Sequence, residues 1–294
     1  MINLDYYKGE DFYSDGKVED FILETLKSGK TLQDLPRSRI TWPVYYHLSP
    51  RREKLLAWYH FRSGANLLEI GAGCGALTPM FCRKLNHVTA VELSRKRAEI
   101  TDTRTTAFNN VEIIAGNLHD IAFRKKFDYI TLIGVLEYAP SFTDLPEPFV
   151  AMLRTVRGLL TENGVLLVAL ENQFGLKYFA GAPEDHLGKC FTGLEGYGNA
   201  SHVRTFGRME LEELFAEAGF SRRSFYYPMP DYKLPKIIFS DEYLPSGNEI
   251  FDVFSPNYDQ DRYALFSERK VYREIIRNGQ FPFFANSFLV EAAE

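Results

Sequence analysis

Apolar residues near the start of the chain recur at the spacing of an α-helix. The positions that share one helical face are Val18, Phe21, Ile22 and Leu26. Gly29 follows them, so the pattern predicts an amphipathic helix that ends there. Residues 31–47 have no regular period and are rich in aromatic side chains. Ser49 and Pro50 are typical of a helix N-cap and first helical position, so we expect a second helix from this point.

From residue 66 onward, short apolar runs alternate with segments of helical character. The runs are Asn66–Ile70, His87–Val91, Val111–Ala115, Tyr129–Ile133 and Gly164–Leu170, and the helical segments are Ala76–Leu85, Ser94–Phe108 and Pro146–Leu160. The connection between the third and fourth runs has room for only a turn or two. Strands that are apolar throughout and alternate with helices indicate a parallel sheet covered on both faces.

The last third of the chain departs from this alternation, and residues 171–203 are dense in glycine, polar and aromatic residues. The elements predicted beyond them are a helix over Arg208–Ala218, a strand over Ser221–Tyr227, a helix over Ser267–Arg277 and a strand over Ser287–Val290. The two late strands are predicted to form an antiparallel pair separated by an insertion. We therefore expect an α/β fold with a doubly wound, mostly parallel sheet of seven strands and an antiparallel C-terminal strand.

The predicted organisation has four parts. They are an N-terminal lid segment over 1–62, a core over 63–228, a cap insertion over 229–286 and a final core strand over 287–294. Aromatic residues are frequent in the C-terminal third, which favours a second packed region there over a tail.

Composition and charge narrow the functional classes. The formal net charge is −5 and no basic stripe dominates, so a nucleic-acid partner is not expected. No apolar run approaches the roughly 20 residues of a membrane helix, and the acidic, aromatic N-terminus is unlike a signal peptide. The three cysteines form no Cys-x-x-Cys pair, so we expect reduced thiols, a cytoplasmic protein and no zinc site. The sequon at Asn199 has no consequence in that compartment.

Three alternate glycines, Gly71, Gly73 and Gly75, lie between the first predicted strand of the core and the following helix. Glycine suits this place because the turn is tight and the backbone must approach a ligand without a Cβ in the way. Dinucleotide-binding folds use a similar triplet, and Ala76 fills the third glycine position of that pattern. The spacing by itself therefore leaves both cofactor classes open.

Polar residues at the ends of neighbouring strands favour an adenosyl amino acid over a dinucleotide. Glu69 lies two residues before the first glycine, where a carboxylate suits a cationic amino group and would repel a pyrophosphate. Glu92 follows the second strand and can accept hydrogen bonds from both ribose hydroxyls, which either cofactor would supply. Asn117 follows the third strand and can pair with an adenine amino group. We expect both carboxylates to be exposed, because this position has little structural use for them.

These segments resemble, in order and spacing, the successive motifs of the class I S-adenosylmethionine-dependent methyltransferases. The matching runs are Leu68–Ala76, Val91–Ser94, Ala115–Asp120 and Phe127–Tyr138. The resemblance covers roughly residues 65–170, and the late antiparallel pair fits the same family. Asn117 is a departure, since many relatives have aspartate there, but an amide can still pair with adenine.

Three longer runs resemble a narrower group, namely bacterial methyltransferases encoded with, or fused to, glycosyltransferases of cell-surface polysaccharide assembly. They are Trp42–Pro50, Glu171–His186 and Val203–Gly219. The resemblance implies S-adenosyl-L-methionine as cofactor, a small-molecule or glycan acceptor, and a fused or associated glycosyltransferase. The expected cofactor-binding residues are Glu69, Gly71, Ala72, Gly73, Cys74, Gly75, Glu92, Leu93, Asn117, Leu118 and Gly134.

Methyl transfer from a sulfonium is an in-line displacement, so an enzyme mainly aligns the nucleophile and excludes water. An alcohol nucleophile also needs a base within hydrogen-bond reach. Sites in open α/β sheets lie at the carboxyl ends of the strands, which directs attention to the ends of the fourth and fifth strands. We expect His186 to be the base, with Asp185 or Glu137 assisting, because a histidine beside a carboxylate can act near neutral pH.

Structural explanations compete with each of these roles. His186 can simply hold a loop, and Glu137 can be a hydrogen-bond acceptor at a strand end. His47 suits packing or helix capping better than chemistry, and Cys74 is expected to matter for its size. The competing functions are a natural-product O- or N-methyltransferase, a nicotinamide-dependent oxidoreductase, and a non-catalytic module that binds the cofactor within a larger assembly.

Overall fold

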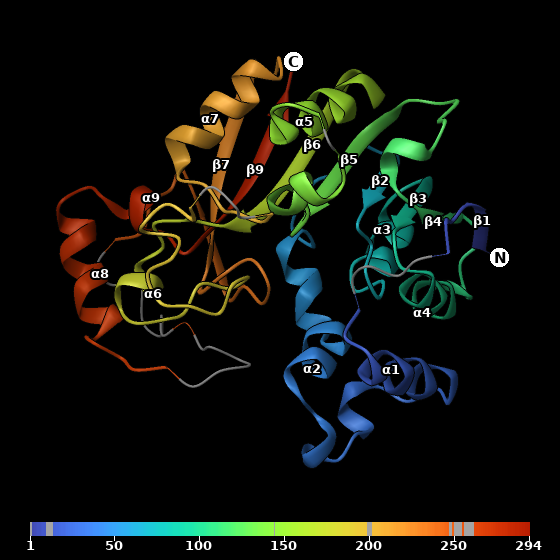
Figure 1. The fold of residues 1–294 in the computed structure, drawn as a ribbon, viewed down its shortest axis with the longest axis horizontal. Helices are drawn as coiled ribbons and strands as arrows, with labels where there is room; N and C mark the ends of the chain where they lie inside the picture. Colours follow the sequence, from blue (N-terminus) through green and yellow to red (C-terminus); the bar gives the residue numbers. More distant parts are fainter. Residues whose placement is uncertain are drawn as a thin grey trace. The chain divides into compact units, whose positions relative to one another are not determined.

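The computed structural model describes residues 2–9, 14–143, 145–198, 202–246, 249, 255 and 262–294. These residues divide into two compact units, which are shown in Figure 1. Unit 1 comprises Met1–Leu132 with Leu159–Val165, and unit 2 comprises Ile133–Gly158 with Leu166–Glu294. The sequon at 199–201 lies outside the described residues, as do residues 247–248, 250–254 and 256–261 of the predicted cap insertion. No helix in the described ranges is both long and apolar enough to cross a bilayer.

Unit 1 carries a parallel sheet in the strand order β1-β4-β3-β2-β5. The strands are β1 (Ile2–Tyr6), β2 (Asn66–Ile70), β3 (His87–Glu92), β4 (Val111–Gly116) and β5 (Phe127–Ile133). The helices are α1 (Lys17–Lys27), α2 (Trp42–Leu48), α3 (Thr78–Lys84) and α4 (Arg95–Thr105). Short 3₁₀ turns are η1 (Leu32–Asp34), η2 (Arg37–Arg39), η3 (Pro50–Leu55) and η4 (Leu118–Asp120). In this unit β2, β3, β4 and β5 confirm the predicted strands.

Unit 2 carries antiparallel strands in the order β6-β9-β7-β8. The strands are β6 (Leu160–Glu171), which begins in unit 1, β7 (Arg222–Met229), β8 (Ile237–Ser240) and β9 (Ser287–Ala293). The helices are α5 (Pro148–Leu159), α6 (Leu176–Phe179), α7 (Arg208–Glu217), α8 (Glu268–Arg277) and α9 (Phe281–Phe284), and η5 (Leu136–Ser141) is a 3₁₀ turn. The pairing of β7 with β9 confirms the predicted antiparallel pair.

The described strands number nine, two more than predicted. The first addition, β1, is a short and partly exposed edge strand whose polar residues hide its period. The second, β8, lies in the predicted insertion and pairs with β7 over four residues. Both additions are short strands stabilised by hydrogen bonds to a longer neighbour, which a local pattern does not reveal.

The helix predicted from Ser49 and Pro50 is present as the 3₁₀ helix η3, and Ser49 caps it by accepting from the backbone N of Arg51 at 3.3 Å. The α-helix Trp42–Leu48 lies mostly in the segment predicted to be irregular and was missed. Tertiary packing explains the difference, because Val44 and Leu48 are buried in a core cluster of unit 1. The other cluster members are Ile22, Leu23, Cys74 and Ile100. A helix of seven residues is marginal unless such an apolar face is buried.

Candidate active site

The loop that follows β2 is held open by its glycines. The backbone N–H groups of Gly71 and Ala72 donate to the carbonyl of Val91 at 2.9 and 3.1 Å, which ties the loop to β3. Gly71, Gly73 and Gly75 all have positive φ. A Cβ at Gly73 would meet no atom within 4 Å, whereas one at Gly75 would lie 2.9 Å from Oγ1 of Thr101. The loop is therefore packed by protein on one side and open at Gly73.

Glu69 lies one residue before the end of β2 and is buried, contrary to the expected exposure. Its Oε2 accepts a hydrogen bond of 2.7 Å from the hydroxyl of Thr78, the first residue of α3. Burial raises the pKa of the Glu69 carboxyl to about 8, and the nearby Glu92 acts in the same direction. A buried carboxyl with a raised pKa is suited to a cationic partner, because the partner would offset the cost of its ionisation.

Glu92 ends β3 and is also buried, which again corrects the expectation of exposure. Its two oxygens accept from the backbone N–H groups of Gly73 at 2.7 Å and Ser94 at 2.9 Å. Burial raises the pKa of Glu92, while the charge of Arg97 opposes the rise. The carboxylate thus has a structural use, since it anchors the glycine loop, and each oxygen retains a further lone pair for a ligand hydroxyl.

Asn117 follows β4 and caps the turn η4, with Oδ1 accepting from the N–H of His119 at 3.1 Å. Leu118 is buried beside it, and Leu93 after β3 is partly buried. Gly134 belongs to unit 2, where its N–H donates to the carbonyl of Ala169 at 2.8 Å. A Cβ there would lie 2.8 Å from the hydroxyl of Tyr232, so protein already fills that side of Gly134.

The residues around the loop of unit 1 fit an adenosyl amino acid. The space at Gly73 would admit a ligand next to the backbone, and two acidic side chains, Glu69 and Glu92, end adjacent parallel strands. A ligand that carries both an ammonium group and a ribose would offer a partner to each carboxylate. A pyrophosphate over this loop would lie near the Glu69 carboxyl, which its charge disfavours.

His186 lies in a turn of unit 2 that is closed by the bridge between Pro183 and Cys190. Its imidazole is oriented by Glu184, whose Oε1 lies 2.8 Å from Nδ1. The same carboxylate accepts from the backbone N–H groups of His186 at 2.8 Å and Leu187 at 2.7 Å, and from the hydroxyl of Tyr197 at 2.9 Å. Glu184 is therefore saturated with hydrogen bonds, and the ring is held in one orientation.

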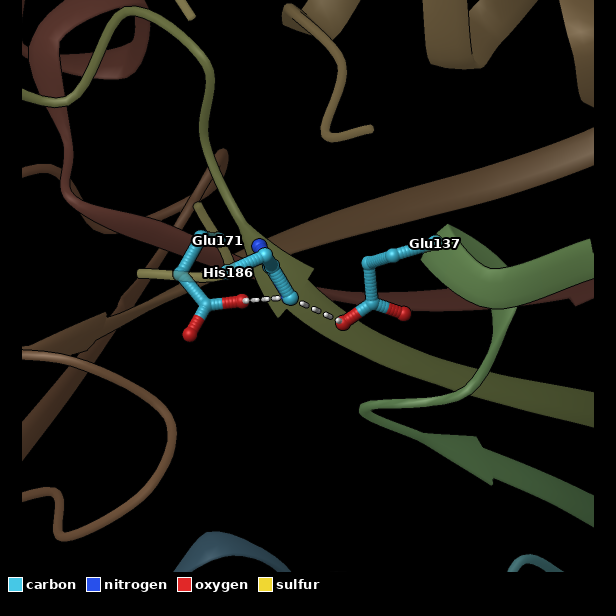
Figure 2. Close-up of side chains that lie close together, drawn as sticks. All are labelled: Glu137, Glu171 and His186. Atoms are coloured by element: carbon cyan, nitrogen blue, oxygen red, sulfur yellow. Dashed lines mark ion pairs between the residues drawn. The ribbon is translucent and has the colours of Figure 1, made fainter. Parts of the chain in front are cut away.

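The other ring nitrogen of His186 faces two buried carboxylates (Figure 2). Nε2 lies 4.0 Å from Oε1 of Glu137, on the turn η5, and 3.9 Å from Oε2 of Glu171, the last residue of β6. Both glutamates are fully buried. Among the described residues, neither carboxylate oxygen of Glu137 has a hydrogen-bond partner. We call these three side chains the Glu137–Glu171–His186 cluster.

Burial and mutual repulsion shift the titration of the cluster. Burial raises the pKa of Glu137 to about 8, and the neighbouring Glu171 adds to the rise. For His186, burial lowers the pKa, but the hydrogen bond to Glu184 and the nearby carboxylates outweigh it and raise the pKa to about 9. With these neighbours the imidazole carries a proton at neutral pH, which corrects the expectation of a neutral base at that pH.

Asp185 does not assist His186, and this expectation was wrong. Its carboxylate instead accepts from Nζ of Lys177 at 2.6 Å, the hydroxyl of Tyr178 at 2.7 Å and Nζ of Lys233 at 2.7 Å. These two lysines hold the pKa of Asp185 well below its usual range, although burial opposes them. Consecutive residues in a turn point in different directions, so the carboxylate next to the histidine in sequence is not the one beside it in space.

Sequence reasoning missed two groups of this site. Glu184 lies within the run Glu171–His186, but the sequence pattern led to no role for it. Lys233 forms ion pairs with Glu171 and Asp185, yet it lies far from both along the chain. Glu184 could have been found from sequence, because a carboxylate in a polar turn often accepts from the backbone N–H two residues further on. No local signal identifies Lys233, because only the fold brings the start of the insertion next to the end of β6.

The chain is similar to known methyltransferases. A family model described as a methyltransferase domain matches residues 44–224, well over half of the chain. The ribosomal RNA small subunit methyltransferase A of Listeria welshimeri is 36% identical over 53 residues, which are 18% of each chain. The malonyl-[acyl-carrier protein] O-methyltransferase of Priestia megaterium is 32% identical over 102 residues, which are 34% of this chain and 37% of that protein. The chain thus spans less than half the length of these curated relatives.

Among solved structures, phosphoethanolamine N-methyltransferase 2 of Haemonchus contortus, in complex with phosphomonomethylethanolamine and S-adenosylhomocysteine, superposes with a TM-score of 0.50. It is 16% identical and covers 84% of this chain and 52% of that chain. At this identity the similarity shows the fold alone. With a methyltransferase domain model matching most of its length and the corresponding α/β fold, the chain belongs to the S-adenosylmethionine-dependent methyltransferases of class I.

Proposed function

We propose that this chain transfers a methyl group from S-adenosylmethionine to a hydroxyl of a small molecule or glycan. The observation that carries the proposal is the loop of unit 1, open at Gly73, with the carboxylates of Glu69 and Glu92 at the ends of β2 and β3. The cofactor supplies an activated methyl group when bound. The chain's own residues then have to hold the cofactor, position the acceptor and accommodate its proton.

Each predicted cofactor contact has a definite role in this proposal. Glu69 binds the ammonium group of the methionine moiety, Glu92 accepts from the ribose hydroxyls, and Asn117 pairs with the adenine amino group. The remaining contacts come from the loop backbone and from small or apolar neighbours, namely Gly71, Ala72, Gly73, Cys74, Gly75, Leu93, Leu118 and Gly134.

The N-terminal residues 1–62 act as a lid on the cofactor loop in this proposal. Arg104 of α4 supports that role, because its guanidinium donates to the carbonyl of Gly75 at 3.0 Å and to that of His47 at 2.6 Å. Cys74 packs against Ile22 and Val44 within unit 1. Residues 229–286 are proposed as a cap of unit 2, and Lys233 at their start forms an ion pair with Glu171.

His186 promotes loss of the acceptor's hydroxyl proton, and Glu137 lies beside it in the same cluster. The geometry of the cluster supports this role, because its two glutamates and the histidine converge from three different segments of unit 2. Glu184 is a positioning residue that fixes the imidazole. Asp185 has an indirect part, since it holds Lys233, which in turn neutralises Glu171.

For the acceptor, we favour a glycan of a cytoplasmic pathway of cell-surface polysaccharide assembly, with a fused or associated glycosyltransferase as partner. This choice depends on the resemblance of three runs of this chain to methyltransferases of that setting. A natural-product acceptor is the second candidate, and the malonyl-carrier O-methyltransferase among the relatives favours keeping it.

Ligand-induced stabilisation tests the cofactor assignment. S-adenosylhomocysteine at 100 times its dissociation constant should stabilise the folded chain by about 2.7 kcal/mol, which is visible as a rise in melting temperature. NAD at the same concentration should leave the melting temperature unchanged. The reverse pattern would identify a nicotinamide-dependent oxidoreductase. Binding of S-adenosylhomocysteine without methyl transfer to any hydroxyl acceptor would favour a non-catalytic module.

Replacement of His186 tests its proposed role in removing the proton of the acceptor hydroxyl. His186→Ala should lower turnover by about 100-fold or more, the usual contribution of a group that assists proton transfer. Formation of S-adenosylhomocysteine would be followed with a panel of methyl glycosides, N-acetylhexosamines and phenols. The affinity for S-adenosylhomocysteine should stay within about twofold of wild type, because His186 has no cofactor contact in the proposal. Unchanged turnover would remove His186 from the mechanism.

A further inference from the structure

The Glu137–Glu171–His186 cluster is costly for the protein as it stands. Glu137 is fully buried, and neither of its carboxylate oxygens has a hydrogen-bond partner among the described residues. Ionising a buried carboxyl that accepts no hydrogen bond is costly, and the His186 imidazole, at 4.0 Å, lies beyond hydrogen-bond distance. Figure 2 shows the carboxylates of Glu137 and Glu171 on opposite sides of the imidazole, each directed toward it. An unsatisfied buried group of this kind requires an explanation.

We propose that Glu137, Glu171 and His186 bind a divalent cation of the manganese-to-zinc range. The three ligand atoms all lie within 4.8 Å of one another. A cation about 2.1 Å from each of three ligand atoms holds those atoms about 3.0–3.6 Å apart, from octahedral to trigonal geometry. The separations of His186 Nε2 from Glu137 and Glu171, at 4.0 and 3.9 Å, exceed that range by a few tenths of an ångström. Binding of a cation would therefore draw the two carboxylates closer to the imidazole and to each other.

The second nitrogen of His186 is prepared for this role. Nδ1 lies 2.8 Å from Oε1 of Glu184, and a carboxylate accepts only from a protonated nitrogen. Displacement of the proton on Nε2 by an incoming cation would leave a lone pair there, and Nε2 faces the two glutamates. Metal-binding histidines commonly donate their other N–H to a carboxylate in the same manner. Tyr197 and Thr205 extend the support, since the Tyr197 hydroxyl donates to Glu184 and lies 2.6 Å from Oγ1 of Thr205.

The net charge of the groups around the cluster favours a divalent cation. Four carboxylates gather here, those of Glu137, Glu171, Glu184 and Asp185, and the cationic groups paired with them besides His186 are Lys177 and Lys233. When a cation displaces the protons of Glu137 and of His186 Nε2, these groups leave two negative charges for it to compensate. Lys233 is paired with Oε1 of Glu171, whereas Oε2 is the oxygen that faces His186. Each carboxylate therefore has an oxygen directed at the position of the cation.

The mixed ligand set limits the choice of cation. Imidazole nitrogen suits zinc and iron, carboxylate oxygen suits manganese, and a set of one nitrogen and two oxygens is intermediate. Magnesium and calcium are disfavoured, because both prefer all-oxygen coordination. Three protein ligands leave at least one coordination position open, as in catalytic rather than structural sites.

The open coordination position on the cation could bind the acceptor hydroxyl during methyl transfer. This role in catalysis depends on the proposed function, whereas the binding of the cation does not. A hydroxyl oxygen bound to the cation becomes more acidic, and its proton leaves to solvent before the oxygen attacks the methyl group. His186 then promotes deprotonation as a ligand of the cation. Binding of the cation itself requires neither the cofactor nor an acceptor.

Metal titration of the full chain tests the proposal. Protein that has been stripped with a chelator and then freed of it should bind one equivalent of Mn²⁺ or Zn²⁺ in isothermal titration calorimetry. Anomalous diffraction from crystals soaked in Mn²⁺ should show a peak between Glu137, Glu171 and His186. The absence of a saturable equivalent, or a peak elsewhere on the chain, would overturn the proposal.

Two substitutions separate metal binding from folding. Glu137→Gln keeps the shape of the side chain and removes a buried charge, so the metal-free protein should be at least as stable as wild type. It should bind Mn²⁺ at least about 100-fold more weakly, and His186→Ala should do the same, because each removes a direct ligand. His87→Ala is the matched control, since His87 lies at the start of β3 in unit 1 and should leave the affinity unchanged. Equal affinity in all four proteins would refute the site.

The outcomes for metal and cofactor are distinguishable. If S-adenosylhomocysteine binds and the stripped protein takes up no equivalent of metal in the titration, the cation proposal fails and the methyltransferase assignment stands. If one equivalent of metal binds at the cluster and S-adenosylhomocysteine does not bind, the cation site stands and the proposed function fails.

Discussion

At the scale of single residues, the glycines of the cofactor loop differ in what surrounds them. Gly73 has positive φ, and a Cβ added to it would have nothing within 4 Å, whereas one at Gly75 would meet Thr101 at 2.9 Å. Gly73→Ala should cost about 1–2 kcal/mol of stability from backbone strain and should weaken S-adenosylhomocysteine binding, because the methyl group takes the ligand's space. Gly75→Ala should cost more stability, with a clash of about 1–3 kcal/mol added to the strain.

Urea denaturation and calorimetric titration with S-adenosylhomocysteine would measure both variants. The expected pattern is a larger loss of stability for Gly75→Ala and a direct loss of affinity for Gly73→Ala. An affinity for Gly73→Ala equal to that of wild type would show that the ligand does not approach this part of the loop.

Glu69 should make cofactor binding depend on pH. Burial raises its pKa to about 8, so below that pH and before the cofactor binds the carboxyl is mainly neutral. A bound ammonium group favours the ionised form and lowers this pKa, so binding below pH 8 releases a proton. The affinity for S-adenosylhomocysteine should therefore rise with pH from about 6 to about 8, by at most about tenfold per pH unit.

Calorimetry in two buffers of different ionisation enthalpy would count the released protons. Glu69→Gln cannot release a proton and should show weaker binding with little dependence on pH over this range. A wild-type affinity that is constant from about pH 6 to about pH 8 would contradict the proposed pairing of Glu69 with the ammonium group.

At the scale of elements, a buried ion pair links α1 to α4 within unit 1. Nε of Arg97 lies 2.7 Å from Oε1 of Glu19, and both side chains are almost fully buried. Arg97→Met should destabilise the fold by about 3–5 kcal/mol, because it leaves the buried carboxylate of Glu19 without a cation. The neighbouring pair of Lys96 with Asp20 is exposed, so Lys96→Met should cost at most about 1 kcal/mol.

The difference between these adjacent substitutions would be measured by chemical denaturation at constant pH. Similar losses of stability in the two variants would mean that the pair of Arg97 and Glu19 adds nothing to the attachment of α1.

Asp15 also contributes to the link between α1 and α4, because its carboxylate lies 2.8 Å from Nη2 of Arg97 and 3.0 Å from Nε2 of His47. His47 thus has the packing role expected for it, with its ring buried against Asp15.

At the scale of the whole molecule, charge argues against a nucleic-acid acceptor, although some relatives are ribosomal RNA methyltransferases. Proteins that bind RNA neutralise several phosphates with clustered lysine and arginine, and this chain has a net charge of −5. Fluorescence polarisation with a labelled ribosomal RNA hairpin at physiological salt should give a dissociation constant above about 10 µM. Tight binding that weakens steeply with salt would instead support RNA as the substrate.

The predicted lid, core and cap describe the molecule at the same scale. These divisions stay predictions, which limited proteolysis with and without S-adenosylhomocysteine would examine.

Strand and helix positions between residues 66 and 171 agree closely with expectation, because each apolar run there is long enough to be recognised and is bounded by turn residues. The N-terminal and insertion elements agree less well, since β1, α2 and β8 depend on partners far away in the sequence.

The amino-acid sequence by itself determined the α/β class, the places of the core strands, the glycine loop and the two acidic residues near it. These features follow from local chemistry, namely side-chain periodicity, backbone freedom and the chain position of a strand end. Only the tertiary structure decided that Glu69 and Glu92 are buried, that Glu184 and not Asp185 orients His186, and that Glu137, Glu171 and Lys233 converge there. Burial and charge pairing depend on which distant segments the fold brings into contact, and that information is not contained in any short stretch of the chain.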